Sequence, residues 1–109
     1  MGFHAHEVSL ELMGAVRPAI EAVAKRDRNL ADQMRRAASS VPLNIAEGRR
    51  RTGRDRQHSY RIAAGSADEL RSALQVAERW GYVDGSSLDA SFALLDRELA
   101  MPRLARVKP

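Results

Sequence analysis

Apolar residues recur along this chain at intervals of three or four positions, which is the spacing of one face of an α-helix. Four such stripes follow one another, with short polar connections between them. Their members, in chain order, are Val8, Leu12, Val16, Ile20 and Val23; Leu30, Met34, Ala38, Val41 and Ile45; Tyr60, Ala63, Ala67, Leu70, Leu74 and Ala77; and Leu88, Phe92, Leu95 and Leu99. The pattern predicts one all-α domain spanning residues 1–109, with helices at roughly 6–26, 29–48, 53–80 and 86–101 and a tail at 103–109. Because short connections make neighbouring helices antiparallel, we expect an up-and-down four-helix bundle.

Prolines and end signals refine this plan for the first two helices. Pro18 predicts a kink or a new helix start, and Pro42 predicts a bend near Ser40, because proline lacks the N–H of a helical hydrogen bond. Asn29 is the expected N-cap of the second helix, and Gly48 is its expected stop.

The later helices carry their own signals. Thr52 with Asp55, and Ser86 with Asp89, have the spacing of capping boxes at the starts of the third and fourth helices. Gly65 lies in the middle of the third helix, where glycine costs about 1 kcal/mol relative to alanine. We expect a close approach of another helix at Gly65 to compensate for that cost.

Composition supports helices and removes several classes of protein. The chain has 18 alanines and 11 leucines but only 5% aromatic residues, which favours close helix packing over a β-sandwich. Cysteine is absent, so disulfides, thiolate metal sites and cysteine nucleophiles are excluded. No apolar run reaches the roughly 18 residues that span a bilayer, and no signal-peptide pattern opens the chain. We therefore expect a cytoplasmic protein that does not engage a membrane.

The net charge of +4 is concentrated in one window. Residues 49–71 contain seven arginines against three acidic residues, whereas acids and bases cancel on either side. Guanidinium groups bind phosphates or carboxylates through paired hydrogen bonds better than lysines do. An anionic partner and a merely solvated helix start are both compatible with this window. The candidate nucleic-acid-binding residues are Arg49, Arg50, Arg51, Arg54 and Arg61.

Arg56 differs from these arginines, because it lies one turn before Tyr60 on the packing stripe of the third helix. A partly buried arginine needs a partner, and the carboxylate of Glu47 is the nearest candidate in sequence. Arg54 and Arg61 lie on another face and are expected to be exposed.

Asn44 and Glu47 are polar residues beside an apolar stripe. Together with Arg56 they form a candidate structural polar motif in which side chains cap or pair with backbone and arginine groups. A small anion-binding or ligand-binding pocket in an assembly is the alternative.

Catalytic chemistry is not apparent in the sequence. His4 and His6 supply two ligands, which do not close a metal site, and the adjacent Asp68 and Glu69 point about 100° apart on a helix. No serine has a base spaced to activate it, and no glycine-rich phosphate loop is present. We expect no enzyme, no catalytic residue, no metal site and no cofactor.

Two separated motifs resemble a known family. They are QMRRAASSVPLNIAEG at residues 33–48, followed by RRRTGRDR, and AAGSADELRSALQVAERWGYVD at residues 63–84. They are similar to the small four-helix-bundle proteins named after the intervening sequences of bacterial 23S rRNA genes, a fold shared with the accessory variability determinants of diversity-generating retroelements. The resemblance covers roughly residues 6–100. It implies an antiparallel bundle that assembles into a homopentameric ring, and in the retroelement relatives it implies basic surfaces that bind nucleic acid.

Two functions follow as hypotheses. The first is an oligomeric nucleic-acid-binding or ribonucleoprotein accessory protein, whose repeated arginine patch contacts the RNA or DNA backbone. The low aromatic content argues against base stacking as its binding mode. The second is a structural adaptor ring whose basic face binds a protein partner.

Overall fold

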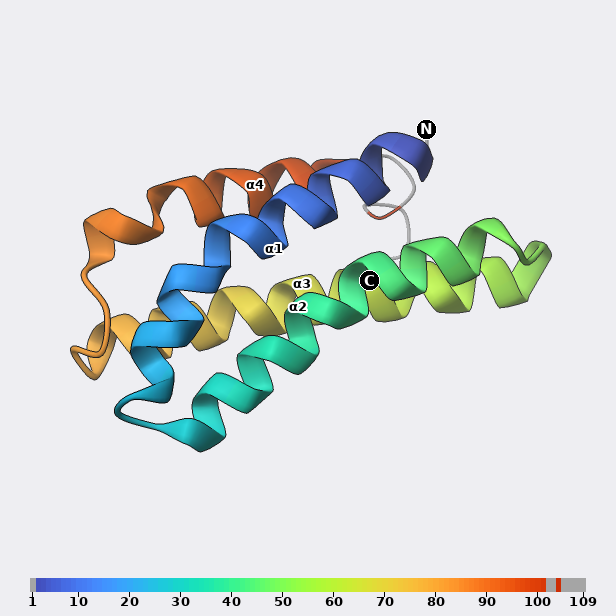
Figure 1. The fold of residues 1–109 in the computed structure, drawn as a ribbon. Coiled ribbons are helices and arrows are strands. Elements are labelled where there is room, and N and C mark those ends of the chain that lie inside the picture. The colour runs from blue at the N-terminus through green and yellow to red at the C-terminus, as the bar shows by residue number, and fades with distance from the viewer. Residues whose placement is uncertain (1, 102–103, 105–109) are drawn as a thin grey trace.

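The computed structural model describes residues 2–101 and 104, with side chains described from His4 onward. It contains the helices α1 (Gly2–Ala24), α2 (Arg28–Arg49), α3 (Gly53–Arg79) and α4 (Asp89–Ala100), and a 3₁₀ turn η1 (Gly85–Leu88) before α4. Consecutive α-helices run antiparallel (Figure 1), and the described residues form no strand. The protein is therefore all-α with four helices packed as in a bundle, as the sequence predicts.

The α2–α3 hairpin forms the main axis of the molecule. α1 packs chiefly against α2, and α4 packs against α1 with fewer contacts to α3. The molecule measures 42 × 24 × 23 Å along its principal axes. Figure 1 shows the turn between α2 and α3 projecting beyond the neighbouring ends of α1 and α4. The arginine-rich residues 49–56 are on this projecting turn.

The core confirms the stripes predicted for the first three helices. Every stripe residue of α1 and α3 is buried, and in α2 only Leu30 is partly exposed. Alanines occupy much of α3's buried face, including Ala63, Ala67 and Ala77. Their small side chains let the α2 and α3 backbones lie close together.

The stripe predicted for the fourth helix is partly wrong. Leu88 and Leu95 are buried, but Phe92 and Leu99 are only partly buried, and the buried face of α4 is formed by Ser91, Leu95 and Glu98. The buried positions Leu88, Ser91, Leu95 and Glu98 keep helical spacing, but two of them are polar, so a pattern of apolar residues selects the neighbouring Phe92 and Leu99 instead. Phe92 still packs against the core with its partly buried side chain, and the guanidinium carbon of Arg71 lies 5.7 Å from the centroid of the Phe92 ring.

The prolines do not interrupt their helices. α1 continues through Pro18 and α2 through Pro42, so a new helix start at Pro18 is wrong. Tertiary packing of the apolar stripes on both sides outweighs the lost hydrogen bond.

Of the three predicted N-terminal signals, Thr52 takes the predicted position, whereas Asn29 and Ser86 do not cap their helices. Asp27, not Asn29, is the N-cap of α2, and its Oδ1 accepts a hydrogen bond from the Leu30 N–H at 3.0 Å. Thr52 occupies the N-cap position of α3 without a side-chain bond. Ser86 donates to Asp84 Oδ2 instead of capping α4. The sequence therefore locates these turns correctly but not the groups that satisfy them.

The close helix approach occurs at Gly48, not at Gly65. α2 continues past Gly48 to Arg49, so Gly48 is not the helix stop. Gly48 is buried, and a Cβ added there would lie within 3.0 Å of three atoms of the Tyr60 ring. Gly65 is exposed, and a Cβ there would meet nothing within 4 Å. The missing side chain of Gly48 thus makes room for Tyr60 on α3.

Candidate nucleic-acid interface

The candidate interface is the tip formed by the last turn of α2, residues 50–52 and the first turns of α3. Arg49, Arg50, Arg54 and Arg61 are exposed there, and none has a side-chain hydrogen bond or ion pair within the described part of the chain. These four residues are named the free arginines below. Their guanidinium groups keep their hydrogen-bonding capacity for a ligand.

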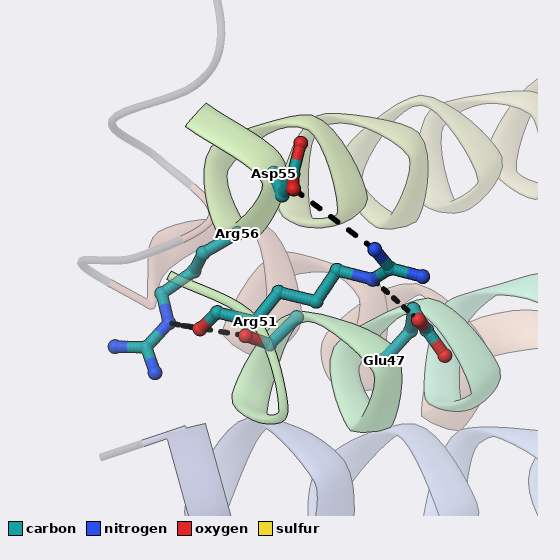
Figure 2. A network of polar contacts seen from close by, with 5 residues as sticks. Glu47, Arg51, Asp55 and Arg56 are labelled. Carbon is teal, nitrogen blue, oxygen red and sulfur yellow. Dashed lines mark hydrogen bonds and ion pairs between the residues drawn. The ribbon is translucent and has the colours of Figure 1, made fainter. Parts of the chain in front are cut away.

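Arg51 is exposed but already paired. Its Nε donates to Glu47 Oε2 at 2.5 Å, and its Nη1 lies 4.0 Å from Asp55 Oδ2. Figure 2 shows the Arg51 guanidinium between the two carboxylates, one from α2 and one from α3. The hydrogen bond and charge of Arg51 lower the pKa of Glu47 and keep it ionised. Of the five predicted binding arginines, Arg51 is therefore the one whose charge is compensated.

Arg56 is half-buried, as its position on the packing stripe suggests, but its partner is not Glu47. Its Nε donates to the carbonyl oxygens of Gly48 at 3.0 Å and Arg51 at 2.8 Å, and its Nη2 donates to that of Arg49 at 3.3 Å. These carbonyls end α2 and continue into the turn, as Figure 2 shows for the Nε contacts. Arg56 thus caps α2 from α3 and places its positive charge at the negative end of the α2 dipole. The expected Arg56–Glu47 pair is wrong, because the backbone of the turn is the closer acceptor.

Asn44 lies two turns before the end of α2 and links it to α3 through serines. Its Nδ2 donates to the carbonyl oxygen and to the Oγ of Ser40, both at 2.9 Å. Ser66 of α3 donates to the same Ser40 Oγ at 2.7 Å. The Asn44 side chain is therefore engaged within the hairpin.

The electrostatics of the tip follow from this division of roles. Arg56 is used by the fold and Arg51 is compensated by carboxylates, so the free arginines carry the uncompensated charge. The first turn of α3 adds the positive end of a helix dipole at the same tip. Forked guanidinium groups on a projecting, positively charged turn can bind phosphate oxygens in pairs.

Other chemistry is scarce in the structure as far as it is described. Residues 2–101 and 104 contain no group of three or more His, Asp or Glu residues that could hold a metal ion. A groove lies between α1 and α2, but its arginines are paired: Arg17 with Glu21 and Arg35 with Asp32, both at 3.1 Å. None of the helices described is long and apolar enough to cross a membrane.

Sequence reasoning missed one buried polar residue outside the tip. Glu98 of α4 is fully buried, and neither of its carboxylate oxygens has a hydrogen-bond partner among residues 2–101 and 104. Burial raises its pKa to about 8, opposed by the nearby positive charge of Arg97. A signal was present, since Glu98 lies three and seven positions after Leu95 and Ser91 on one helical face.

The fold and the tip together define a class: small helical-bundle proteins with an arginine-rich hairpin turn. The family model described as 23S rRNA-intervening sequence protein matches residues 4–102. The chain therefore belongs to this family, in agreement with the resemblance carried by residues 33–48 and 63–84. No curated protein and no solved structure matches the chain.

Proposed function

We propose that this protein is a non-enzymatic, homo-oligomeric nucleic-acid-binding protein of the cytoplasm that acts as an accessory to RNA or ribonucleoprotein. The observation that carries the proposal is the set of four free arginines, three at the projecting turn and Arg61 further along α3. Binding is to the phosphate backbone and needs no cofactor or metal. Each phosphate contact releases condensed counterions, so binding depends steeply on salt.

The family name supports RNA as the nucleic acid, because it refers to intervening sequences of 23S rRNA. The name describes the family and not a measured activity of this chain. We therefore propose that the free arginines recognise the phosphate backbone, which RNA and DNA share.

Self-association is the second part of the proposal. Leu43 of α2 is 67% exposed, and Ile62 and Val76 of α3 are 39% and 43% exposed. These exposed apolar side chains of α2 and α3 support a contact with a second copy. In the pentamer that the family resemblance implies, five tips would act together, so that weak patches bind jointly.

The test is binding of a fluorescently labelled RNA hairpin, measured by anisotropy over a range of salt concentrations. Replacing Arg50 and Arg54 by glutamine should weaken binding and reduce the slope of log K against log salt by roughly 0.9 for each phosphate that the variant no longer binds. Arg35→Gln is the matched control, because Arg35 is also exposed but is paired with Asp32. Equal slopes for wild type and the tip variant would refute the proposal.

Light scattering on the same samples tests assembly. The chain has a mass of 12.1 kDa, so a pentamer has about five times that mass. Val76→Glu should lower the assembled mass, because it replaces an exposed apolar side chain by a charge that a contact between copies would bury.

A protein adaptor is the alternative function, since guanidinium groups also bind carboxylates. An oligomer that ignores RNA at every salt concentration would favour a partner protein with an acidic surface.

A further inference from the structure

The end of the bundle opposite the arginine tip brings two turns together. One is the α1–α2 turn at residues 25–27, and the other is the α3–η1 turn at residues 80–84 (Figure 1). The guanidinium of Arg26 in the first turn lies 5.5 Å from the ring centroid of Tyr82 in the second. This contact joins segments more than fifty residues apart in sequence.

The α3–η1 turn fixes an aromatic pair. Gly81 has a φ of +78°, a left-handed conformation that favours glycine. The Tyr82 N–H donates to the Ala77 carbonyl oxygen and the Gly81 N–H to that of Glu78, both at 2.9 Å, which is the Schellman pattern at a helix end. This reversal returns the chain so that Tyr82 lies beside Trp80. Their ring centroids are 6.4 Å apart and their planes are 20° apart.

Trp80 is the open member of this stack. Its side chain is 68% exposed, the highest value among the exposed large hydrophobic residues of the described part, whereas Tyr82 is half-buried. The Tyr82 ring contacts both the Arg26 guanidinium and the Trp80 ring system. The Trp80 indole thus presents aromatic surface to solvent beside this contact.

Four cations, Lys25, Arg26, Arg28 and Arg79, and three acids, Asp27, Glu78 and Asp84, belong to the two turns and their neighbouring residues, which leaves one net positive charge beside the stack. The side chains of Lys25, Arg28 and Arg79 are exposed and have no polar partner among the residues described. Of the acids nearby, Asp27 accepts the N-cap hydrogen bond of α2, and Asp84 accepts from Ser86. Glu78 packs against Gly85.

We propose that Trp80, Tyr82 and Arg26 form a stacking platform for one unpaired base of a single-stranded nucleic acid. Lys25, Arg28 and Arg79 would contact the adjoining phosphates. This inference rests on the proposed function and adds a ligand class to it, because a stacking platform accepts an unpaired base but not a base within a duplex. The low aromatic content of the whole chain does not oppose it, since two of the five aromatic residues meet at this site.

A nucleobase fits the observations better than an apolar protein surface. A base continues an aromatic stack through its flat face and brings a phosphate within reach of nearby cations. An apolar protein side chain would instead leave Lys25, Arg28 and Arg79 to be desolvated without a counter-charge.

Trp80 is the only tryptophan of the chain, so its fluorescence reports directly on the platform. The probes are a short oligouridylate, which is single-stranded, and an RNA duplex of the same length. Oligouridylate should quench Trp80 fluorescence, whereas the duplex should bind through the arginine tip without quenching it.

Variants then separate this site from the tip. In anisotropy measurements, Trp80→Ala should bind oligouridylate about tenfold more weakly and the duplex with unchanged affinity. Trp80→Phe should keep part of the oligouridylate affinity, because a smaller ring still stacks. The matched reciprocal variant is Arg50→Gln with Arg54→Gln, which should weaken the duplex and leave the quenching by bound oligouridylate in place.

Three results would overturn the platform. The first is oligouridylate that binds without quenching, and the second is equal oligouridylate affinity of wild type and Trp80→Ala. The third is a lower assembled mass of Trp80→Ala in light scattering, which would assign Trp80 to a contact between copies. In each case the salt-dependent binding of the duplex tests the arginine tip independently of the platform. Absence of binding to both RNAs would reject both proposals.

Discussion

The α2–α3 hairpin and helix α4 differ in how they treat polar groups away from solvent. In the hairpin, Arg56 bonds the turn carbonyls, and Asn44 and Ser66 meet at Ser40. In α4, the carboxylate of Glu98 and the hydroxyl of Ser91 are buried and have no hydrogen-bond partner in the described part of the chain. The hairpin therefore gains from its polar groups, whereas α4 docks at a desolvation cost.

The difference extends to the contacts between helices. α2 and α3 share the most extensive contact in the molecule, while α4 has a smaller contact with α1 and a still smaller one with α3. Across its outer side, α4 is tied to α3 by the ion pair of Arg71 with Asp96 and by Phe92 beneath Arg71. Packing around the tip is therefore tight, whereas α4 is held to the rest of the bundle by smaller contacts.

The largest expected effect concerns the desolvation cost of burying the Glu98 carboxyl in α4. The pKa of Glu98 is about 8 in the folded chain, against an ordinary value of 4.5, so between these values the folded chain holds a proton that the unfolded chain has lost. Stability therefore falls as pH rises from about 4.5 to about 8, by about 1.4 kcal/mol per unit, and then levels off. Denaturant unfolding at about pH 5 and about pH 7.5 should show a loss roughly 3 kcal/mol larger for wild type than for Glu98→Gln. Equal losses of unfolding free energy in wild type and Glu98→Gln would show that burying Glu98 has no desolvation cost.

The next effect concerns the tightest point of the hairpin. Gly48→Ala places a Cβ against the Tyr60 ring and should lower the free energy of unfolding by about 1–3 kcal/mol, the usual cost of overpacking. Gly65→Ala is the matched control on α3, and it should raise stability by up to about 1 kcal/mol, because the site is open and helical. Thermal unfolding of both variants gives the two signs. A neutral Gly48→Ala would show that Tyr60 moves aside freely.

A smaller effect concerns the cap on α2. Arg56→Ala removes the side chain that bonds three carbonyls and should cost about 1–2 kcal/mol, since Arg56 is only half-buried. Arg56→Lys should recover part of this loss through its charge. Arg54→Ala, a change of the same kind at a free arginine, should stay within about 0.5 kcal/mol of wild type. If both alanine variants unfold alike, Arg56 has no capping role.

The smallest effect on stability concerns the exposed pair at the tip. Glu47→Gln removes the main partner of Arg51 and, because surface pairs contribute little, should leave the melting temperature nearly unchanged. It should instead release Arg51 for phosphate and steepen the salt dependence of RNA binding by roughly one phosphate. An unchanged salt slope would mean that Arg51 does not face the RNA.

The sequence predicts the first three helices well because their apolar stripes are long and regular. It misplaces the face of α4 because a serine and an acid, Ser91 and Glu98, occupy buried positions that an apolar pattern passes over. The sequence also predicts the close helix approach at the wrong glycine, Gly65. The position of a glycine within a helix does not show which side chain of a neighbouring helix faces it. Only the structure shows Tyr60 against Gly48.

The candidate site was predictable in composition but not in its division of roles. The local excess of arginine marks the turn, and the stripe position of Arg56 correctly separates it from the exposed arginines. The hydrogen-bond partners of Arg56 could not be predicted, because they are backbone carbonyl groups, which every residue has. The stack of Trp80, Tyr82 and Arg26 was missed for a similar reason, since it joins two turns that are distant in the chain.

The cap formed by Arg56 has a consequence for the order of folding. Its carbonyl partners lie only five to eight residues earlier in the chain, so closing this loop costs little entropy and the hairpin turn can form early. α4, with its weaker and more distant contacts, is then expected to dock last. High φ-values at Gly48 and low ones at Leu95 in refolding kinetics would reveal this order. A folding intermediate in which α4 has not yet docked would therefore already have the arginine-rich turn in its native conformation.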